Sequence, residues 1–403
     1  MIPFSPPRMD QKIIDEVTDT LRSGWITTGP KTQRFEQNLA DFTGAKAVVC
    51  LNSATAGLHL ALWSFGIGEG DEVIVPAYTY CATANVVRHL GATPIMVDIN
   101  EDGYGINFDE VAAKINEKTK AIMPVDVAGI PCNYDKLQKI LSQNWSKIFV
   151  PNNDFQKQLG RPLVVVDAAH SLGSSYGDVK QGALFDMASF SFHAVKNLST
   201  AEGGALAINL PDGFDSEALK KRIKTASLHG QSKDALNKLQ PGAWEYDVEF
   251  AGFKCNMTDI QASMGLVELA RYEDDTLVKR RELVENYKRL ISEHSHWFKG
   301  INHFEANKAS SYHLYLLQLS DELKKYRDQI ILECASEVAL NVHYKPLPLL
   351  KVYNDLGYEL DDYPEAKKKF QGVISLPLFY DLTSEQQSTV INCIVKAIKK
   401  CIG

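Results

Sequence analysis

The sequence predicts an α/β protein with a mostly parallel sheet flanked by helices, followed by a smaller C-terminal α+β domain. Three observations predict this fold. The chain has 403 residues, of which 45% are hydrophobic and 23% are charged, a composition typical of globular proteins. In its first two-thirds, short and continuous apolar segments alternate with helix-like stretches. Such apolar segments suit strands covered on both faces, and most spacers between them have room for crossover helices.

The strands expected in the large domain are short apolar segments, several of which end in a proline or an aspartate. A surface insertion is expected at residues 141–161, which contain the run Pro151-Asn152-Asn153-Asp154 and precede a core strand. The predicted strands are residues 47–51, 72–76, 94–98, 121–127, 163–167, 187–192 and 204–208.

The pattern of residues changes after about residue 250. Residues 258–294 are rich in Glu, Leu, Arg and Lys and contain no proline, which predicts helix. A final helix is expected after Thr383, because Thr383 and Gln386 have the spacing of a capping box. We therefore expect a large domain over residues 1–250 and a small domain over 251–403. The strands expected in the small domain are 312–319, 338–344 and 373–378.

Composition also excludes several classes of protein. The net charge of −7 argues against a nucleic-acid binder with a basic surface. No apolar run reaches the roughly 18 residues that a membrane-spanning helix needs, and the N-terminus has no signal-peptide pattern. The seven cysteines include no CxxC pair, so we expect free thiols, no metal site and a cytoplasmic location.

A lysine and an aspartate follow two of the predicted strands. Lys196 lies just past the strand 187–192, where open α/β sheets place their ligands. This position favours a Schiff-base lysine, and a plain surface lysine is the alternative. Asp167 ends the apolar strand 163–167, where a carboxylate is costly unless a cation pairs with it. A protonated pyridine nitrogen is one such partner, and the alternatives are a structural cap or a metal ligand.

Two further strand ends complete the candidate site. The loop Asn52-Ser53-Ala54-Thr55-Ala56-Gly57 enters a helix whose first N–H groups are free to hold a phosphate, unless this is an ordinary helix cap. Tyr80 follows the strand 72–76 and offers a ring for stacking, unless it is a core residue. A phosphate loop, an aromatic ring, an aspartate and a lysine on one parallel sheet are the groups that pyridoxal 5′-phosphate (PLP) requires.

Longer motifs extend along nearly the whole chain. They are Ser23–Pro30, Phe35-Glu36, Gly70–Val73, Ser191–Asn197, Glu202-Gly203-Gly204, His229-Gly230, Met257–Ala262, His343–Pro346 and Ser375–Leu378. With these motifs the sequence resembles the fold-type I PLP enzymes and, more closely, the DegT/DnrJ/StrS family of nucleotide-sugar aminotransferases. The resemblance implies a large PLP-binding domain and an N-terminal segment that packs near the small domain.

The resemblance implies a role for each matching residue. Lys196 carries PLP as a Schiff base and shuttles the proton, while Asp167 pairs with the pyridine nitrogen. Tyr80 stacks on the ring, and His170 lies near it. Asn256 reaches the phosphate bound by the neighbouring subunit, which implies a homodimer with shared active sites. The other matches are Ala54, Thr55 and Ser191 at the phosphate, and Trp25, Thr28, His343 and Tyr344 on the substrate side, where a hydrogen-bonded core pair is the alternative for the last two.

The implied reaction moves the amino group of L-glutamate to a keto group of a nucleotide-linked hexose or pentose. It yields 2-oxoglutarate, passes through pyridoxamine phosphate (PMP) and serves amino-sugar or surface-polysaccharide synthesis. Three alternatives stay open: a PLP-dependent sugar dehydratase, whose branch has His in place of the lysine; a non-catalytic regulatory PLP-binding protein; and a PLP enzyme acting on amino acids. The sequence departs from the family pattern at Asp126, where many members have His, and at Lys254 and Asn256.

Overall fold

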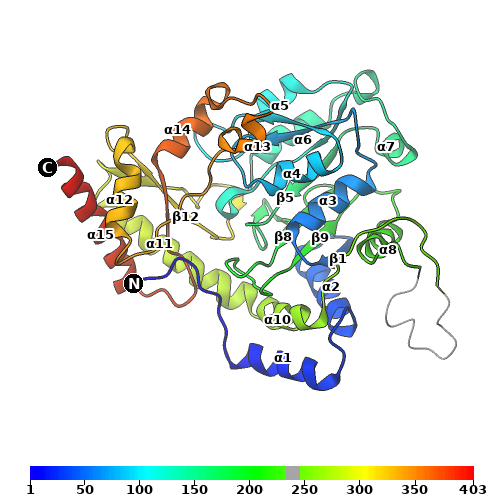
Figure 1. Ribbon diagram of the computed structural model, residues 1–403, viewed down its shortest axis with the longest axis horizontal. Helices are drawn as coiled ribbons and strands as arrows, with labels where there is room; N and C mark the ends of the chain where they lie inside the picture. The colour runs from blue at the N-terminus through cyan, green and yellow to red at the C-terminus, as the bar shows by residue number, and fades with distance from the viewer. Residues whose placement is uncertain (233–245) are drawn as a thin grey trace.

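The computed structural model describes residues 1–232 and 246–403 (Figure 1). Its centre is a seven-stranded sheet in which β3, β2, β4, β5 and β8 run parallel, while β9 runs antiparallel to both of its neighbours. The predicted α/β fold with a mostly parallel sheet is confirmed. In spatial order the strands are β1 (Ala47–Leu51), β9 (Gly204–Ile208), β8 (Met187–Ser191), β5 (Leu163–Asp167), β4 (Thr119–Ile122), β2 (Glu72–Pro76) and β3 (Thr93–Val97).

Two details of this sheet differ from the prediction for physical reasons. The connection from β8 to β9, residues 192–203, contains no helix, so β9 returns beside β8 in the antiparallel direction. The strand expected at 121–127 ends at Ile122. Pro124 has no N–H group with which to continue the ladder, and the chain then turns at Ala128, whose φ is 62°.

Helices cover the sheet, and two of them begin shortly after the carboxyl ends of β1 and β2. Helix α3 packs across β9, β8 and β5. It approaches closely because Gly57 has no side chain, and a Cβ there would lie 2.3 Å from Ser189 Oγ. The helices of this part are α1 (Gln11–Ser23), α2 (Pro30–Thr43), α3 (Ala54–Ser64), α4 (Ala82–His89), α5 (Phe108–Lys114), α6 (Tyr134–Leu141), α7 (Asp154–Leu159), α8 (Ser216–Ser227) and α10 (Asp259–Ala270).

The C-terminal part builds a second, smaller α+β layer with its own apolar cluster. Its antiparallel sheet has the order β10 (Phe298–Gly300), β12 (Tyr315–Leu319), β13 (Val373–Leu376). The predicted capping box of Thr383 and Gln386 is present at the start of α15. The boundary at residue 250 stays a prediction. The helices here are α11 (Val278–Ser292), α12 (Arg327–Cys334), α13 (Lys351–Asn354), α14 (Pro364–Gly372) and α15 (Ser384–Ile402).

Three predictions for this part need correction. The helix expected over 258–294 is interrupted by a π-helical turn at Tyr272–Leu277. The strand expected at 312–319 begins only at Tyr315, because Tyr312 has a left-handed φ of 55°. Residues 338–344 form no regular strand. They make single bridges, from Val338 to Ile2 and from Asn341 to Ser375, before the chain leaves this sheet for the carboxyl edge of the central one.

The insertion at 141–161 lies at the periphery of the fold with α7 (Figure 1). It is nevertheless fixed to the core, since the side chain of Gln156 is fully buried and donates to the Phe65 carbonyl at 3.0 Å. Within the described ranges, no helix has the length and apolar character needed to cross a bilayer.

Candidate active site

A cavity of about 470 Å³ opens at the carboxyl edge of the central sheet, the edge at which open α/β sheets hold their ligands. The ends of β5 and β8, the start of α3 and a segment of the C-terminal part form its walls. The predicted site residues that line it are Ala54, Thr55, Tyr80, Asp167, His170, Ser191, Lys196, His343 and Tyr344.

Lys196 lines the cavity from the loop that follows β8. Its amide donates to the His193 carbonyl at 2.8 Å, which closes a turn in this loop. Burial lowers the pKa of Lys196 to about 8, because the ammonium loses hydration, while the carboxylate of Asp167 opposes this shift. The side chain is therefore an unprotonated, nucleophilic amine far more often than an ordinary lysine.

Asp167 is buried at the end of β5. Its Oδ2 accepts a hydrogen bond from Thr83 Oγ1 at 2.7 Å, and its Oδ1 accepts one from the Ala169 amide at 3.2 Å. Burial raises the pKa of Asp167, and these hydrogen bonds and Lys196 oppose the shift. A buried carboxylate on a cavity wall is costly without a cation, so this wall favours a cationic group of a ligand.

The start of α3 offers free donors to the same cavity. Ser53 is the N-cap residue, and its Oγ accepts from the Ala56 amide at 3.1 Å. The amides of Ala54 and Thr55 have no acceptor within residues 1–232 and 246–403, so they remain available to an anion at the positive end of the helix. Gly204 allows the start of β9 to lie close to the backbone of this loop, because a Cβ at this position would lie 2.3 Å from the carbonyl carbon of Ser53.

Aromatic side chains close the remaining wall. Tyr80 is 59% exposed, and its ring lies 6.0 Å from that of Tyr344. His170 Nδ1 accepts from the Ala128 amide at 3.2 Å, and His170 Nε2 lies 2.7 Å from Tyr344 Oη. Burial lowers the pKa of His170 well below its ordinary value, so this imidazole is neutral at physiological pH. The cavity thus combines an amine, a carboxylate, free amides and the exposed ring of Tyr80.

Comparison with known proteins assigns this arrangement to a family. Residues 7–395 match the DegT/DnrJ/EryC1/StrS aminotransferase family. The chain belongs to this family.

Individual relatives match nearly the whole chain. Spr1654 of Streptococcus pneumoniae, a provisionally assigned sugar aminotransferase solved in a PMP form, is 45% identical over 99% of this chain and 100% of that one, with a TM-score of 0.95. Its PLP form gives a TM-score of 0.93 at 43% identity, covering 99% of each chain. SpsC, a spore coat polysaccharide biosynthesis protein of Bacillus subtilis, is 36% identical over 99% of this chain and 97% of its own length. PseC of Helicobacter pylori, an aminotransferase involved in pseudoaminic acid biosynthesis, is 27% identical over 98% of this chain and 99% of that one, with a TM-score of 0.85.

Three of the site residues expected from the DegT family resemblance do not line the cavity: Trp25, Thr28 and Asn256. Asn256 Nδ2 donates to Thr28 Oγ1 at 2.6 Å, and Asn256 Oδ1 accepts from Lys254 Nζ at 2.5 Å. The Trp25 indole donates to the Thr28 carbonyl at 3.2 Å. It packs over Gly29, where a Cβ would fall 1.7 Å from the indole nitrogen. The structure therefore groups these residues with one another rather than with Lys196.

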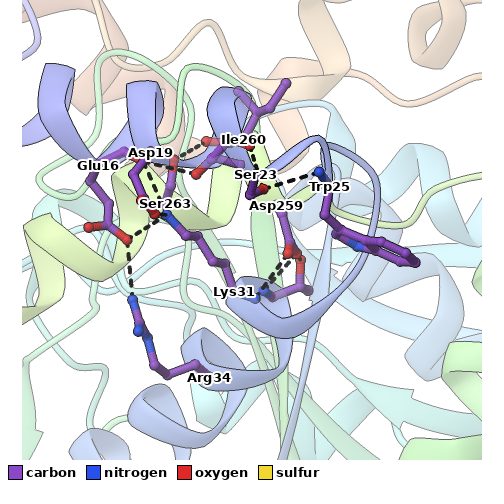
Figure 2. Close-up of polar contacts among 11 residues, drawn as sticks. Glu16, Asp19, Ser23, Trp25, Lys31, Arg34, Asp259, Ile260 and Ser263 are labelled. Carbon is purple, nitrogen blue, oxygen red and sulfur yellow. Dashed lines mark hydrogen bonds and ion pairs between the residues drawn. The ribbon is translucent and has the colours of Figure 1, made fainter. Parts of the chain in front are cut away.

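Asp259 holds this group in place by capping α2 from another helix (Figure 2). Its carboxylate accepts from the Gly29 amide at 2.8 Å and from the Lys31 amide at 3.0 Å. Lys31 Nζ in turn pairs with Glu16 at 2.8 Å and Asp19 at 2.7 Å on α1. The segment that carries Trp25 and Thr28 is thus tied to α1, α2 and α10 together.

His343 is fixed on three sides at the cavity wall. Its Nδ1 lies 2.8 Å from Ser375 Oγ, and its carbonyl accepts from Tyr78 Oη at 2.7 Å. Its ring stacks on Phe4 with the centroids 5.6 Å apart. Burial and the nearby Lys196 lower the pKa of His343 to about 4, so the ring is neutral near pH 7. A substrate contact for His343 stays a prediction.

The family departure at Asp126 is explained by packing. Asp126 is buried outside the lining of the cavity. Its carboxylate accepts from Tyr134 Oη at 2.7 Å, from the Cys132 amide at 3.0 Å and from Gln181 Nε2 at 2.5 Å. Burial raises the pKa of Asp126. The residue fastens the loop after β4 to the core.

Three residues of the cavity region were missed from the sequence. Thr83 holds Asp167, and its only sequence signal is a place in the first turn of the helix after Tyr80. His193 and Glu202 lie at the cavity rim, with His193 Nε2 3.6 Å from Glu202 Oε1. Both belong to family motifs, so motif membership was the signal that would have identified them.

Proposed function

We propose that this chain is a PLP-dependent aminotransferase that moves the amino group of L-glutamate to a keto group of a nucleotide-linked hexose or pentose. One observation carries the proposal: a single cavity gathers Lys196, Asp167 and the free amides at the start of α3. Membership of the DegT family and the names of its sugar aminotransferase relatives support a sugar as acceptor. The name of SpsC supports a place in polysaccharide biosynthesis.

The lining residues fit PLP in charge and in chemistry. Lys196 supplies an amine for the aldehyde, and Asp167 supplies the carboxylate that a protonated pyridine nitrogen pairs with. The amides of Ala54 and Thr55 supply donors for the phosphate, and the exposed ring of Tyr80 supplies a stacking surface. When bound, PLP supplies an electron sink for the negative charge that develops at the substrate carbon.

The protein's own contribution is proton transfer and positioning. Lys196 Nζ takes a proton from the amino-bearing carbon of the substrate and returns one, since its pKa of about 8 keeps both protonation states accessible near neutral pH. Asp167 keeps its ligand nitrogen protonated, and Thr83 keeps Asp167 in one orientation.

We also propose a homodimer in which Asn256, Thr28 and Trp25 serve the cavity of the partner subunit. Their grouping outside their own cavity supports this arrangement. The ammonium of Lys254, which donates to Asn256, adds positive charge suited to a phosphate.

The alternative functions predict a different residue at position 196 or a different reaction in this cavity. A sugar dehydratase of this family has His in place of the lysine, and this chain has Lys196. A regulatory PLP-binding protein would not transfer an amine. An enzyme acting on amino acids would aminate 2-oxo acids and leave keto sugars unchanged, so a screen of amine acceptors separates it from the proposed function.

The test is the visible absorption spectrum of the purified protein before and after L-glutamate. We expect a band of lysine-bound PLP that L-glutamate converts to the PMP form, and amination of a nucleotide-linked keto sugar afterwards. Lys196→Ala should lack the resting band and lose turnover by at least about 10³-fold. The control is Lys351→Ala, because Lys351 is an exposed lysine paired with Asp355. A band that ignores L-glutamate, or turnover retained in Lys196→Ala, would contradict the proposal.

A further inference from the structure

The hydrogen bonds of His170 determine which of its ring nitrogens carries the proton. The Ala128 amide can only donate, and it points at His170 Nδ1 at 3.2 Å, so Nδ1 must be the bare, accepting nitrogen. Because the buried ring is neutral, its single proton then resides on Nε2. Nε2 lies 2.7 Å from Tyr344 Oη, so the imidazole donates to the tyrosine oxygen.

Because His170 is the donor in this hydrogen bond, the hydroxyl proton of Tyr344 has no acceptor inside the described part of the chain. The oxygen already accepts from His170, and it has no other hydrogen-bond partner there. Tyr344 lines the cavity that contains Lys196 and Asp167. Its O–H group is therefore free to donate to a ligand in this cavity.

The surrounding contacts keep His170 in this orientation. Its ring lies 4.3 Å from the ring of His313. His313 Nδ1 lies 2.8 Å from Asn197 Oδ1, and Asn197 directly follows Lys196. The amide of Asn197 is itself fixed, because its Nδ2 donates to the Ser311 carbonyl at 2.6 Å. A series of neutral groups in contact thus runs from the lysine loop behind the cavity to Tyr344.

We propose that Tyr344 is a ligand-binding residue that donates its hydroxyl proton to an anionic oxygen in the cavity, and that His170 is the positioning residue that sets the direction of this donation. The proposal rests on the proposed function. Two oxygens share the required chemistry: the phenolate oxygen of the bound cofactor, and a carboxylate oxygen of the amino donor. A donor polarised by a second hydrogen bond holds such an oxygen more strongly than an isolated hydroxyl.

The first test needs no cofactor. Protein labelled with ¹⁵N-histidine and freed of PLP should show, by NMR, a His170 ring protonated at Nε2 and bare at Nδ1. The signals of His170 are identified by their loss in His170→Gln. A ring protonated at Nδ1 would overturn the proposal, because the tyrosine hydroxyl would then donate its proton to His170 Nε2 and not to a ligand.

The second test uses the PLP-loaded protein and separates the two oxygens. In Tyr344→Phe, loss of a donor to the phenolate should raise the pH midpoint of the visible band by about one unit. Loss of a donor to the carboxylate should leave that midpoint in place and raise KM for L-glutamate about tenfold or more with little change in kcat. If neither quantity changes, the proposal is overturned.

Variants of Tyr353 and His170 test whether the effects of Tyr344→Phe are specific to the donor in the cavity. Tyr353→Phe is the matched control, because Tyr353 is buried and its hydroxyl donates to Asn85 Oδ1 at 2.7 Å outside the cavity. His170→Gln retains an N–H donor of similar reach, so it should preserve the band midpoint and KM, whereas His170→Leu should reproduce the effect of Tyr344→Phe. A wild-type protein that shows no visible band would overturn the proposed function instead, and the tautomer measured without cofactor keeps the two failures apart.

Discussion

The hydroxyl of Thr83 donates a 2.7 Å hydrogen bond to the buried carboxylate of Asp167. Thr79 Oγ1 lies 2.9 Å from Thr83 Oγ1, so the threonine itself is fixed by a neighbour on the same loop and helix. Asp167 is thereby held in one orientation by neutral groups, which leaves its charge uncompensated by any salt bridge in the described residues. The protein accepts this cost at a position where a cationic ligand would remove it.

The first prediction concerns the stability of the cofactor-free protein. The pKa of Asp167 is raised in the folded state, so the folded protein loses stability as pH rises from 3.8 through that raised pKa. Asp167→Asn removes the buried charge and should raise the free energy of unfolding at pH 7 by about 1 kcal/mol. Urea unfolding at pH 7 and below pH 4 checks this, since the difference should vanish at the acidic pH. The same variant should bind PLP more weakly, and equal or lower stability at pH 7 would contradict the argument.

The second prediction concerns the pH dependence of cofactor capture. Lys196 has a pKa of about 8, so its reactive amine fraction rises with pH and levels off above that value. Stopped-flow mixing of PLP with cofactor-free protein should give a rate that stops rising near pH 8. Free Nα-acetyl-lysine is the control, and its rate should rise until about pH 10. A protein rate that still rises at pH 10 would show an ordinary lysine.

The third prediction concerns the cap that Asp259 provides for α2. Its carboxylate accepts from three backbone amides, those of Gly29, Lys31 and Thr32. Asp259→Ala leaves buried donors without partners and should lower the free energy of unfolding by about 2–4 kcal/mol. Asp215→Ala is the control, because Asp215 caps α8 through the single amide of Ala218 at an exposed site and should cost about 1 kcal/mol. Equal losses in the two variants would show that the cross-helix cap has no special role.

The fourth prediction tests the shared active site through mixed dimers. Lys196→Ala and Asn256→Ala should each be impaired alone. If Asn256 serves the partner's cavity, a hybrid dimer contains one cavity with both residues intact, and mixing the two variants should restore up to about half of the activity of one wild-type dimer. If Asn256 serves its own cavity, no hybrid has an intact site and mixing restores nothing. Mixing Lys196→Ala with itself after unfolding and refolding is the control for reassembly.

The part of the site that the sequence predicted consists of residues at or just after the carboxyl ends of strands. The exact first and last residues of the elements were predicted less well. The apolar segment that ends at Asp167 and the one that precedes Lys196 are strands in the structure, and both residues line the cavity. Continuous apolar runs identify buried strands, and parallel strands bring their carboxyl ends to one edge. This rule required no knowledge of long-range contacts.

What could not be predicted depends on contacts between distant segments. Thr83 holds Asp167 across a separation of 84 residues, and nothing near Thr83 in the sequence marks that contact. Residues 338–344 have the apolar pattern of a strand, yet the end of this segment leaves the small sheet, because the carbonyl of His343 and the hydroxyl of Tyr344 form hydrogen bonds with Tyr78 and His170. The antiparallel direction of β9 likewise follows from a connection without a helix rather than from its apolar pattern.

The position of β1 at the edge of the sheet has a consequence for synthesis on the ribosome. Within the described ranges β9 is the only strand that pairs with β1, apart from a single bridge between Leu51 and Asn256, and about 150 residues separate the end of β1 at Leu51 from the start of β9 at Gly204. At roughly 5–20 residues per second, the apolar segment Ala47–Leu51 waits on the order of 10–30 s for its partner to emerge. During that interval its backbone groups are open to pairing with another chain. We therefore expect slower translation before residue 204 to increase aggregation of the nascent chain. Chaperones that bind extended apolar segments should reduce this aggregation.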